Sequence, residues 1–136
     1  MIYFIQAEQT KKIKIGFTKK WIAKRMSSMR SESPDSLVFL GGIAGNRLEE
    51  KLLHKQFSHI HSHGEWFYEC LELVEFINSL PLKNEQCFDI LSERLEKGEL
   101  SVEEANLLTS DDILKESSER LTKALNNLYK TVSPLS

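Results

Sequence analysis

The sequence MIYFIQAEQTKKIKIG, residues 1–16, decides the fold of this chain. It contains two short apolar runs, residues 2–5 and 13–16, on either side of a polar segment. Two such runs around a polar turn are typical of a β-hairpin. We therefore expect two antiparallel strands, with Tyr3 in the first and Lys14 in the second.

The length and composition predict one soluble domain, or one domain with a helical tail. The chain has 136 residues, of which 40% are hydrophobic and 28% charged, values that are usual for globular proteins. No apolar run reaches membrane length and no signal-peptide pattern is present, so we expect a cytoplasmic protein without membrane contact. Cys70 and Cys87 lack the spacing of a metal site, so we expect free thiols.

Further elements follow the hairpin in an alternating order. We expect a helix over about residues 19–29, a short strand over 37–40, a helix over 47–58 and a helix that ends before Pro81. Asn46 is the expected N-cap of the second of these helices. Its expected apolar side consists of Leu48, Leu52, Leu53 and Phe57, and the following residues, 59–63, are interpreted as a polar link.

The composition changes after Pro81. We expect a domain over residues 1–80 and an acidic helical extension over 81–136, with helices over about 84–97, 101–108 and 111–130. An apolar stripe in the last helix suggests a homodimer through the C-terminal helices; it consists of Leu114, Leu121, Leu125 and Leu128 with Ala124. Because the extension is acidic, it could instead fold over the basic face.

The charge is distributed unevenly. The net charge is -2, yet residues 1–80 hold 11 Lys and Arg against 9 Asp and Glu, whereas residues 81–136 hold 7 against 11. A segment without acidic residues contains Lys11, Lys12, Lys14, Lys19, Lys20, Lys24, Arg25 and Arg30. Such a basic face suits a polyanion, with phosphate contacts supplying most of the affinity. The alternative is an ordinary solvated surface.

Four side chains could together hydrolyse a phosphodiester; in chain order they are Tyr3, Lys14, Arg25 and Glu50. Glu50 is a candidate ligand for Mg²⁺ or Mn²⁺, because Mg²⁺ needs few protein ligands. Arg25 presents a planar fork suited to phosphate. Tyr3 could orient or deprotonate the attacking water, provided that a cation such as Lys14 lowers its pKa. Each residue also has a structural interpretation: Tyr3 as core, Lys14 as the solvent side of a strand, and Arg25 and Glu50 as surface charges.

The order of these segments resembles the GIY-YIG nuclease superfamily, specifically its phage and bacterial branch with degenerate motifs. Residues 1–3, MIY, and 14–16, KIG, are similar to its two tripeptides, and Arg25 follows at the family's spacing. The helix segment LEEKLLHKQF, residues 48–57, and GEWF, residues 64–67, resemble later motifs of this branch. The resemblance covers about residues 1–78.

This resemblance implies an α+β fold in which a small three-stranded antiparallel sheet is flanked by helices. It also implies a metal-dependent DNA endonuclease with Tyr3, Arg25 and Glu50 at the catalytic positions and Lys14 in place of a tyrosine. His54, one turn after Glu50, is expected to touch a phosphate or to hold the carboxylate. DNA-binding side chains are expected among the basic residues Lys11, Lys12, Lys19, Lys20, Lys24 and Arg30.

Other interpretations stay open from the sequence. The chain could be a DNA-binding module that has lost useful turnover, or a protein-interaction adaptor that acts through its helical extension. His59, His61 and His63 alternate and could bind a transition metal. Glu65 is expected to have a structural role, either as a capping residue or in an ion pair. The alternative is a role at the edge of the catalytic site.

Overall fold

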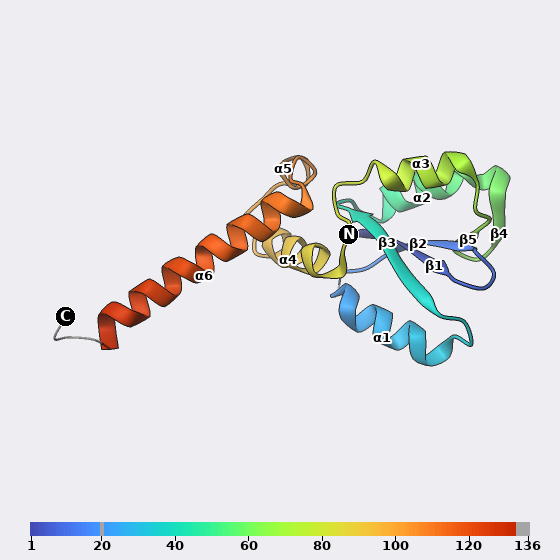
Figure 1. Cartoon of the computed structure of the whole chain (residues 1–136). Helices are drawn as coiled ribbons and strands as arrows, with labels where there is room; N and C mark the ends of the chain where they lie inside the picture. The colour runs from blue at the N-terminus through green and yellow to red at the C-terminus, as the bar shows by residue number, and fades with distance from the viewer. Residues whose placement is uncertain (20, 133–136) are drawn as a thin grey trace.

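The fold is a five-stranded antiparallel sheet with helices on both faces, followed by three further helices (Figure 1). The structure is a computed structural model that describes residues 1–19 and 21–132. The strand order is β3-β1-β2-β5-β4. The bounds are Ile2–Ala7 for β1, Ile13–Phe17 for β2, Leu37–Ile43 for β3, His61–His63 for β4 and Trp66–Phe67 for β5.

The N-terminal hairpin is confirmed. β1 and β2 pair in a register that places Tyr3 opposite Gly16 and Ile5 opposite Lys14. Because side chains alternate along a strand, Tyr3 and Ile5 enter one core layer, while Phe4 and Ile15 enter the other. β1 lies between β2 and β3 and is buried on both faces, which explains its nearly continuous apolar sequence.

The α+β class is correct, but the expected three-stranded sheet is wrong. The segment interpreted as a polar link contains β4 and turns back into β5 through Gly64, whose φ is +54°. β5 then pairs with β2, so that Phe67 lies opposite Ile13 and is fully buried. Strands of two or three residues are too short to show an apolar alternation, so the sequence pattern could not reveal them.

Helices cover the two faces of the sheet. Figure 1 shows α2 (Arg47–Gln56) and α3 (Leu71–Asn78) on one face and α1 (Ile22–Glu32) on the other. Phe57, Leu73 and Ile77 complete the core on the first face. Ile22 and Met26 of α1 are buried on the second.

The orientation of α2 differs from the expected one. Leu48 and Leu52 are 65% and 58% exposed, whereas Glu50 is only 5% exposed. The expected N-cap is confirmed, since the Asn46 side chain accepts from the backbone N–H of Glu49 in a capping box. Leu53 and Phe57, by contrast, pack in the core as expected. The expected apolar side is therefore correct in part: Leu48 and Leu52 face solvent, and the Glu50 carboxylate takes a buried position.

The C-terminal helices are α4 (Glu85–Glu96), α5 (Val102–Ala105) and α6 (Ser110–Val132). α4 packs directly on the sheet, because Phe88 is fully buried and its ring contacts Phe39 at a centroid distance of 5.7 Å. A Cβ at Gly42 would lie 2.3 Å from the Phe88 ring, so only glycine allows this approach. The division at residue 80 into a domain and an extension stays a prediction.

Within residues 1–19 and 21–132, no helix is both long and apolar enough to span a bilayer.

The packing of Phe88 predicts that α4 stabilises the sheet. Phe88→Ala is expected to lower the free energy of unfolding by about 3–5 kcal/mol, because it leaves a cavity over Gly42. The measurement is urea unfolding followed by circular dichroism. Leu107→Ala, at an apolar residue that is 82% exposed, is the matched control and should change stability by no more than about 0.5 kcal/mol. Equal effects of the two substitutions would contradict the role of α4.

Candidate functional site

The Tyr3 side chain in β1 is fully buried, and its hydroxyl group contacts the side chain of Arg25 in α1. The Nε–H of Arg25 donates to the Tyr3 hydroxyl oxygen at 3.4 Å. The ring lies over Gly16, where an added Cβ would be 2.3 Å from Cζ of Tyr3. The glycine therefore creates the space for the phenol, and the hairpin and α1 together determine where its oxygen lies.

The environment of Tyr3 keeps its phenol protonated. Burial raises the pKa of Tyr3, and the hydrogen bond from Arg25 only partly offsets this effect. The expectation that Lys14 lowers this pKa is wrong, because the pKa is raised and the cation that contacts the phenol is Arg25. Tyr3 can therefore donate a hydrogen bond from its hydroxyl group while it accepts one from Arg25.

Lys14 is half-buried on the same face of the sheet. Its Nζ lies 3.6 Å from a carboxylate oxygen of Glu65 and 3.6 Å from the Met29 sulfur, and 6.0 Å from the centre of the Trp66 ring. The Lys14 side chain is only 14% exposed. It is therefore held in place beside the turn before β5 and is not an ordinary solvated residue of a strand edge.

His54 attaches α2 to the edge of β2. The N–H of Ile15 donates to the carbonyl of Glu65 at 3.0 Å, and β5 leaves the Ile15 carbonyl without a strand partner. His54 Nε2 lies 2.8 Å from that carbonyl oxygen and 3.5 Å from a carboxylate oxygen of Glu50. Because a carbonyl only accepts, Nε2 carries the proton. Of the two expected roles, this geometry matches the one in which His54 holds the carboxylate.

Glu50 and Glu65 form a pair of neighbouring carboxyl groups. Burial raises the pKa of Glu50 and the charge of Glu65 raises it further, while the charges of His54 and Arg47 lower it only in part. The site therefore holds two carboxyl groups, of which Glu65 pairs with Lys14 and Glu50 lies beside His54. Of the roles expected for Glu65, the structure shows pairing, because a carboxylate oxygen of Glu65 lies 3.6 Å from Nζ of Lys14.

The donor set of this carboxyl pair fits a hard divalent cation. Mg²⁺ prefers oxygen ligands and keeps several waters, so one or two carboxylates are sufficient. No group of three or more His, Cys, Asp or Glu side chains suited to a metal occurs in the described part of the chain. The alternating histidines do not converge: His59 pairs with Glu72 at 3.2 Å and His61 contacts the Gly64 carbonyl at 2.8 Å.

The basic residues surround this site without joining its hydrogen-bond network. Lys11 and Lys12 precede β2 and Lys19 follows it, while Lys24 projects from α1. Lys11, Lys19 and Lys24 are exposed. Lys12 is half-buried, and its Nζ lies 5.4 Å from the centre of the Tyr68 ring. Arg30 instead donates to the Leu37 carbonyl at 3.2 Å and lies 3.9 Å from Glu85. Lys20 lies outside the described residues.

The N-terminus of α1 is capped by a residue that the sequence analysis missed. Trp21 occupies the N-cap position and provides no side-chain cap. Asp89 of α4 accepts instead from the N–H groups of Ile22 at 2.5 Å and Ala23 at 3.2 Å. A carboxylate at this end also complements the helix dipole. The helix that carries Arg25 is thus fixed from a position far along the chain, with no local signal that could have revealed it.

The T5orf172 domain matches residues 1–80, which is more than half of the chain. The chain belongs to the T5orf172 domain family. This domain occurs in phage and bacterial proteins with nuclease-like associations. All five site residues, Tyr3, Lys14, Arg25, Glu50 and His54, lie within the matched T5orf172 region. No curated protein and no solved structure matches the chain at a significant level.

Because burial raises the pKa of Glu50, we expect ionised Glu50 to lower the free energy of unfolding of the protein. A group whose pKa is raised on folding favours the folded state below its ordinary pKa and loses this contribution as the pH rises through the folded pKa. Without a divalent cation, Glu50→Gln should therefore raise the melting temperature at neutral pH, and the gain should vanish below about pH 4. Thermal unfolding in EDTA across this pH range measures the effect.

Glu75→Gln, on the exposed face of α3, is the matched control and should show no such gain. The ordinary pKa of a carboxyl group is about 4. A rise in the melting temperature of Glu50→Gln that stays constant from about pH 4 to neutral pH would therefore contradict a role for ionisation of Glu50.

The cap from Asp89 predicts a local effect on α1. Asp89→Ala should lower the free energy of unfolding by about 0.5–2 kcal/mol, because it removes the N-cap acceptor. It should also speed hydrogen exchange at the amides of Ile22 and Ala23 beyond the change that global stability explains. Asp111→Ala is the control at an exposed carboxylate. Unchanged exchange at both amides would show that the cap does not hold this helix end.

Proposed function

We propose that this T5orf172 protein is a metal-dependent endonuclease of the GIY-YIG type that hydrolyses phosphodiester bonds in DNA. The observation that carries the proposal is the convergence of a phenol, two cations and a buried carboxylate from β1, β2, α1 and α2. Tyr3 and Arg25 are in contact, and Glu65 pairs with Lys14 and raises the pKa of Glu50. The family's nuclease-like associations support the same class of reaction.

Arg25 is the proposed phosphate-binding group. Its Nε–H is used on Tyr3, which leaves the two terminal amino groups of the guanidinium free to bind phosphate oxygens in a fork geometry. The contact with Tyr3 fixes the orientation of the guanidinium plane. Lys14 is a second cation that can balance the charge that develops at phosphorus.

Tyr3 is proposed to orient the attacking water and not to deprotonate it. Its raised pKa keeps the hydroxyl group neutral at physiological pH, and its oxygen already accepts from Arg25. The hydroxyl proton is then available to a water or a phosphate oxygen. Holding the water in line with the scissile bond contributes by orientation, which does not require a phenolate.

Glu50 is the proposed ligand of the divalent cation, and His54 is a positioning residue that holds this carboxylate. A bound Mg²⁺ or Mn²⁺ would supply charge neutralisation and assistance to the leaving oxygen. Hydrolysis adds the water oxygen to phosphorus, breaks one P–O ester bond and leaves a proton on the departing sugar oxygen. The exposed lysines around β2 would bind the flanking phosphates.

One observation favours a second candidate, a DNA-binding module without useful turnover. The Tyr3 ring is fully buried and its pKa is raised, so the phenol is a poor base. This candidate predicts salt-sensitive DNA binding without cleavage, because phosphate contacts release counterions.

Plasmid cleavage distinguishes the two. The wild-type protein should nick or linearise plasmid in Mg²⁺ or Mn²⁺ but not in EDTA. Tyr3→Phe, Arg25→Ala and Glu50→Gln should each reduce the rate by roughly 10²-fold or more, the usual effect of removing one group that stabilises a transition state. Glu75→Gln should cleave like the wild type. Because Glu50→Gln is expected to be the more stable protein, its loss of activity cannot be due to unfolding.

Metal binding provides a readout that does not depend on turnover. Mg²⁺ should raise the melting temperature of the wild type by mass action but not that of Glu50→Gln. Cleavage that survives in Glu50→Gln and Tyr3→Phe would overturn the proposal. Intact plasmid in all reactions, with retained DNA binding, would establish the second candidate.

A further inference from the structure

Three cations form a row along the exposed side of α2, the helix that carries Glu50. Arg47, Lys51 and Lys55 recur at four-residue intervals, and all three are exposed. Side chains four positions apart are neighbours on a helix surface, so these three residues form one continuous surface, which we call the α2 row. At a rise of about 1.5 Å per residue, the row is about 12 Å long. None of its residues belongs to the basic segment around β2.

The α2 row lies along the edge of the candidate site. Helical spacing places Arg47 and Lys51 on the side of α2 that carries His54, and His54 contacts the edge of β2. The guanidinium carbon of Arg47 lies 4.9 Å from the centre of the Phe17 ring in β2. The charge of Arg47 also offsets part of the rise in the pKa of Glu50. The row is therefore next to the proposed metal ligand and faces the same open edge of the sheet.

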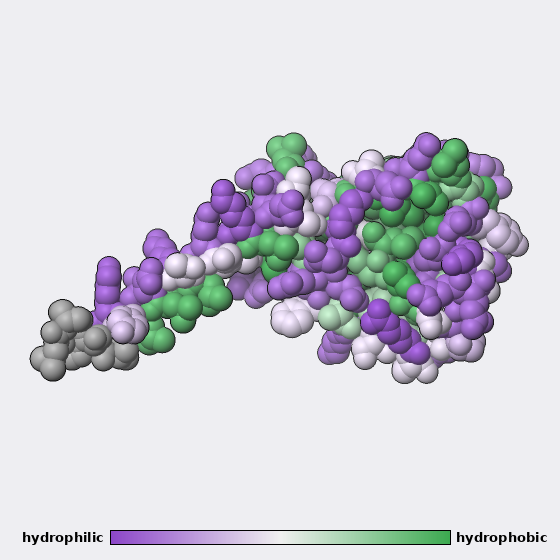
Figure 2. Space-filling model, viewed as in Figure 1, coloured by the Kyte–Doolittle hydropathy of each residue, from purple (hydrophilic) through white to green (hydrophobic). Residues whose placement is uncertain are grey.

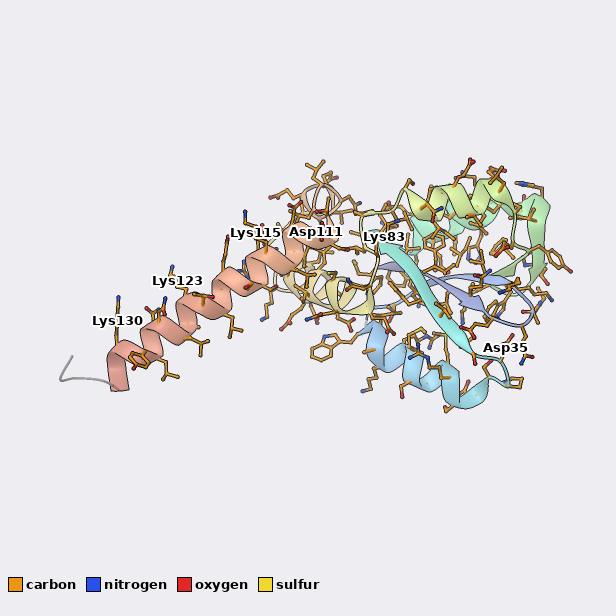
Figure 3. All side chains as sticks on the ribbon, viewed as in Figure 1. Asp35, Lys83, Asp111, Lys115, Lys123 and Lys130 are labelled. Atoms are coloured by element: carbon orange, nitrogen blue, oxygen red, sulfur yellow. The ribbon has the colours of Figure 1, made fainter. Side chains whose placement is uncertain are left out.

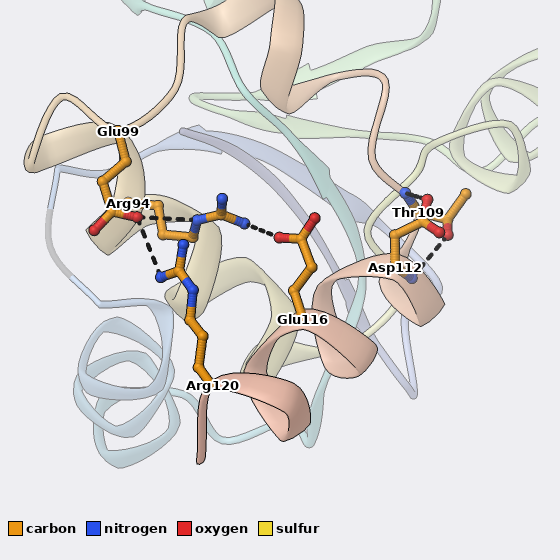
Figure 4. A network of polar contacts seen from close by, with 6 residues as sticks. All are labelled: Arg94, Glu99, Thr109, Asp112, Glu116 and Arg120. Carbon is orange, nitrogen blue, oxygen red and sulfur yellow. Dashed lines mark hydrogen bonds and ion pairs between the residues drawn. The ribbon is translucent and has the colours of Figure 1, made fainter. Parts of the chain in front are cut away.

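The cations of the α2 row have no carboxylate partner. Among the residues that the structure describes, no ion pair involves any of the three. Cations elsewhere on the helices are neutralised: at the end of α4 the same four-residue spacing holds an opposite-charge pair, Lys97 with Glu93 at 3.0 Å. Figure 4 shows Arg94 and Arg120 both joined to Glu99, at 3.2 and 3.3 Å. The positive charge of the α2 row is thus left available to a ligand.

This arrangement is unfavourable for α2 by itself. Like charges four residues apart repel each other on a helix. Arg47 is also the first residue of α2, where the positive end of the helix dipole disfavours a cation. Local choices that oppose the stability of an element are expected at functional sites. An anion bound along the row would remove the repulsion, and one phosphate group is too small to contact cations spread over about 12 Å.

We propose that the α2 row binds the phosphate backbone of the DNA strand that flanks the scissile phosphodiester. The inference rests on the proposed function, because it takes the scissile phosphate to lie between Arg25 and Glu50. Figure 1 shows α1 and α2 on opposite faces of the sheet, so the cations of α1 contact the backbone on one side of the site and the α2 row contacts it on the other. Such contacts position the strand without reading its sequence.

Salt-dependent DNA binding by the full chain tests the proposal. The probe is a short fluorescein-labelled DNA duplex, and its anisotropy is measured in EDTA, which prevents metal-dependent cleavage. Arg47→Gln, Lys51→Gln and Lys55→Gln combined should weaken binding by roughly tenfold or more. The slope of log affinity against log salt should become less steep by about 2.7, because each lost phosphate contact removes about 0.9.

The matched control removes the same net charge from α6. Figure 3 shows Lys115, Lys123 and Lys130 along one edge of this helix, and Figure 2 shows hydrophilic residues along the same edge. All three lysines are exposed. Lys115→Gln, Lys123→Gln and Lys130→Gln combined should leave the salt slope equal to that of the wild type. Circular dichroism checks that both triple variants stay folded.

Photo-crosslinking measures the proximity of the row to DNA directly. In a Cys70→Ser background, a thiol-reactive photo-crosslinker attached to Lys55→Cys should join the protein to the duplex on irradiation. The same group attached to Lys123→Cys should not. Cys87 is fully buried, so its thiol does not compete for the reagent in the folded protein.

The outcomes separate this inference from the proposed function. An unchanged salt slope in the α2 triple variant, with plasmid cleavage by the wild type, would overturn the role of the row and leave the nuclease standing. Equal losses in the two triple variants would show an effect of net charge alone and would also overturn it. Intact plasmid in every reaction, with DNA binding that depends on the row, would refute the nuclease and support the row. A wild-type protein that binds no DNA would overturn both.

Discussion

The phenol ring of Tyr3 occupies the space in which any side chain at position 16 would lie. This one contact sets the hairpin register, because only Gly16 can stand opposite the ring. The same register determines that Lys14, two residues earlier, enters the layer beneath α1. The hydroxyl group of the fixed ring in turn accepts from Arg25. The positions of the charged side chains in the site therefore depend on the packing of Tyr3 against Gly16 in the hairpin.

The second constraint is electrostatic. A helix that exposes Leu48 and Leu52 and buries Glu50 does not have the arrangement that burial of apolar surface alone would select. The His54 contact with the Ile15 carbonyl holds it there and satisfies a strand edge that β5 does not cover. Proteins tolerate such local costs where a site must bind charge. The neighbouring Glu65 increases this cost, and a cation would remove it.

The sequence predicted the parts of this fold that have strong local patterns. The alternation in residues 1–16 and the N-cap at Asn46 both have local physical causes, and both are confirmed. The sequence did not predict β4 and β5, because strands of three and two residues are too short to show an alternation of apolar and polar side chains. The expected apolar side of α2 was correct for Leu53 and Phe57 but wrong for Leu48 and Leu52, because the contact of His54 with the edge of β2 also holds the orientation of the helix. The direction of the pKa shift of Tyr3 could not be predicted, because it depends chiefly on burial of the phenol in the folded chain, and the cation that contacts the phenol is Arg25 of α1.

The cap on α1 has a consequence for the order in which the chain can fold. Asp89 is separated from Ile22 by 67 positions, so during synthesis the hairpin and α1 leave the ribosome well before the carboxylate that completes them. At typical elongation rates this delay is on the order of several seconds. The basic segment and Arg25 are thus exposed on a nascent chain whose α1 lacks its cap. The N-terminus of α1 gains its cap only after α4 has emerged, so a contact between segments far apart in the sequence completes the folding of this helix.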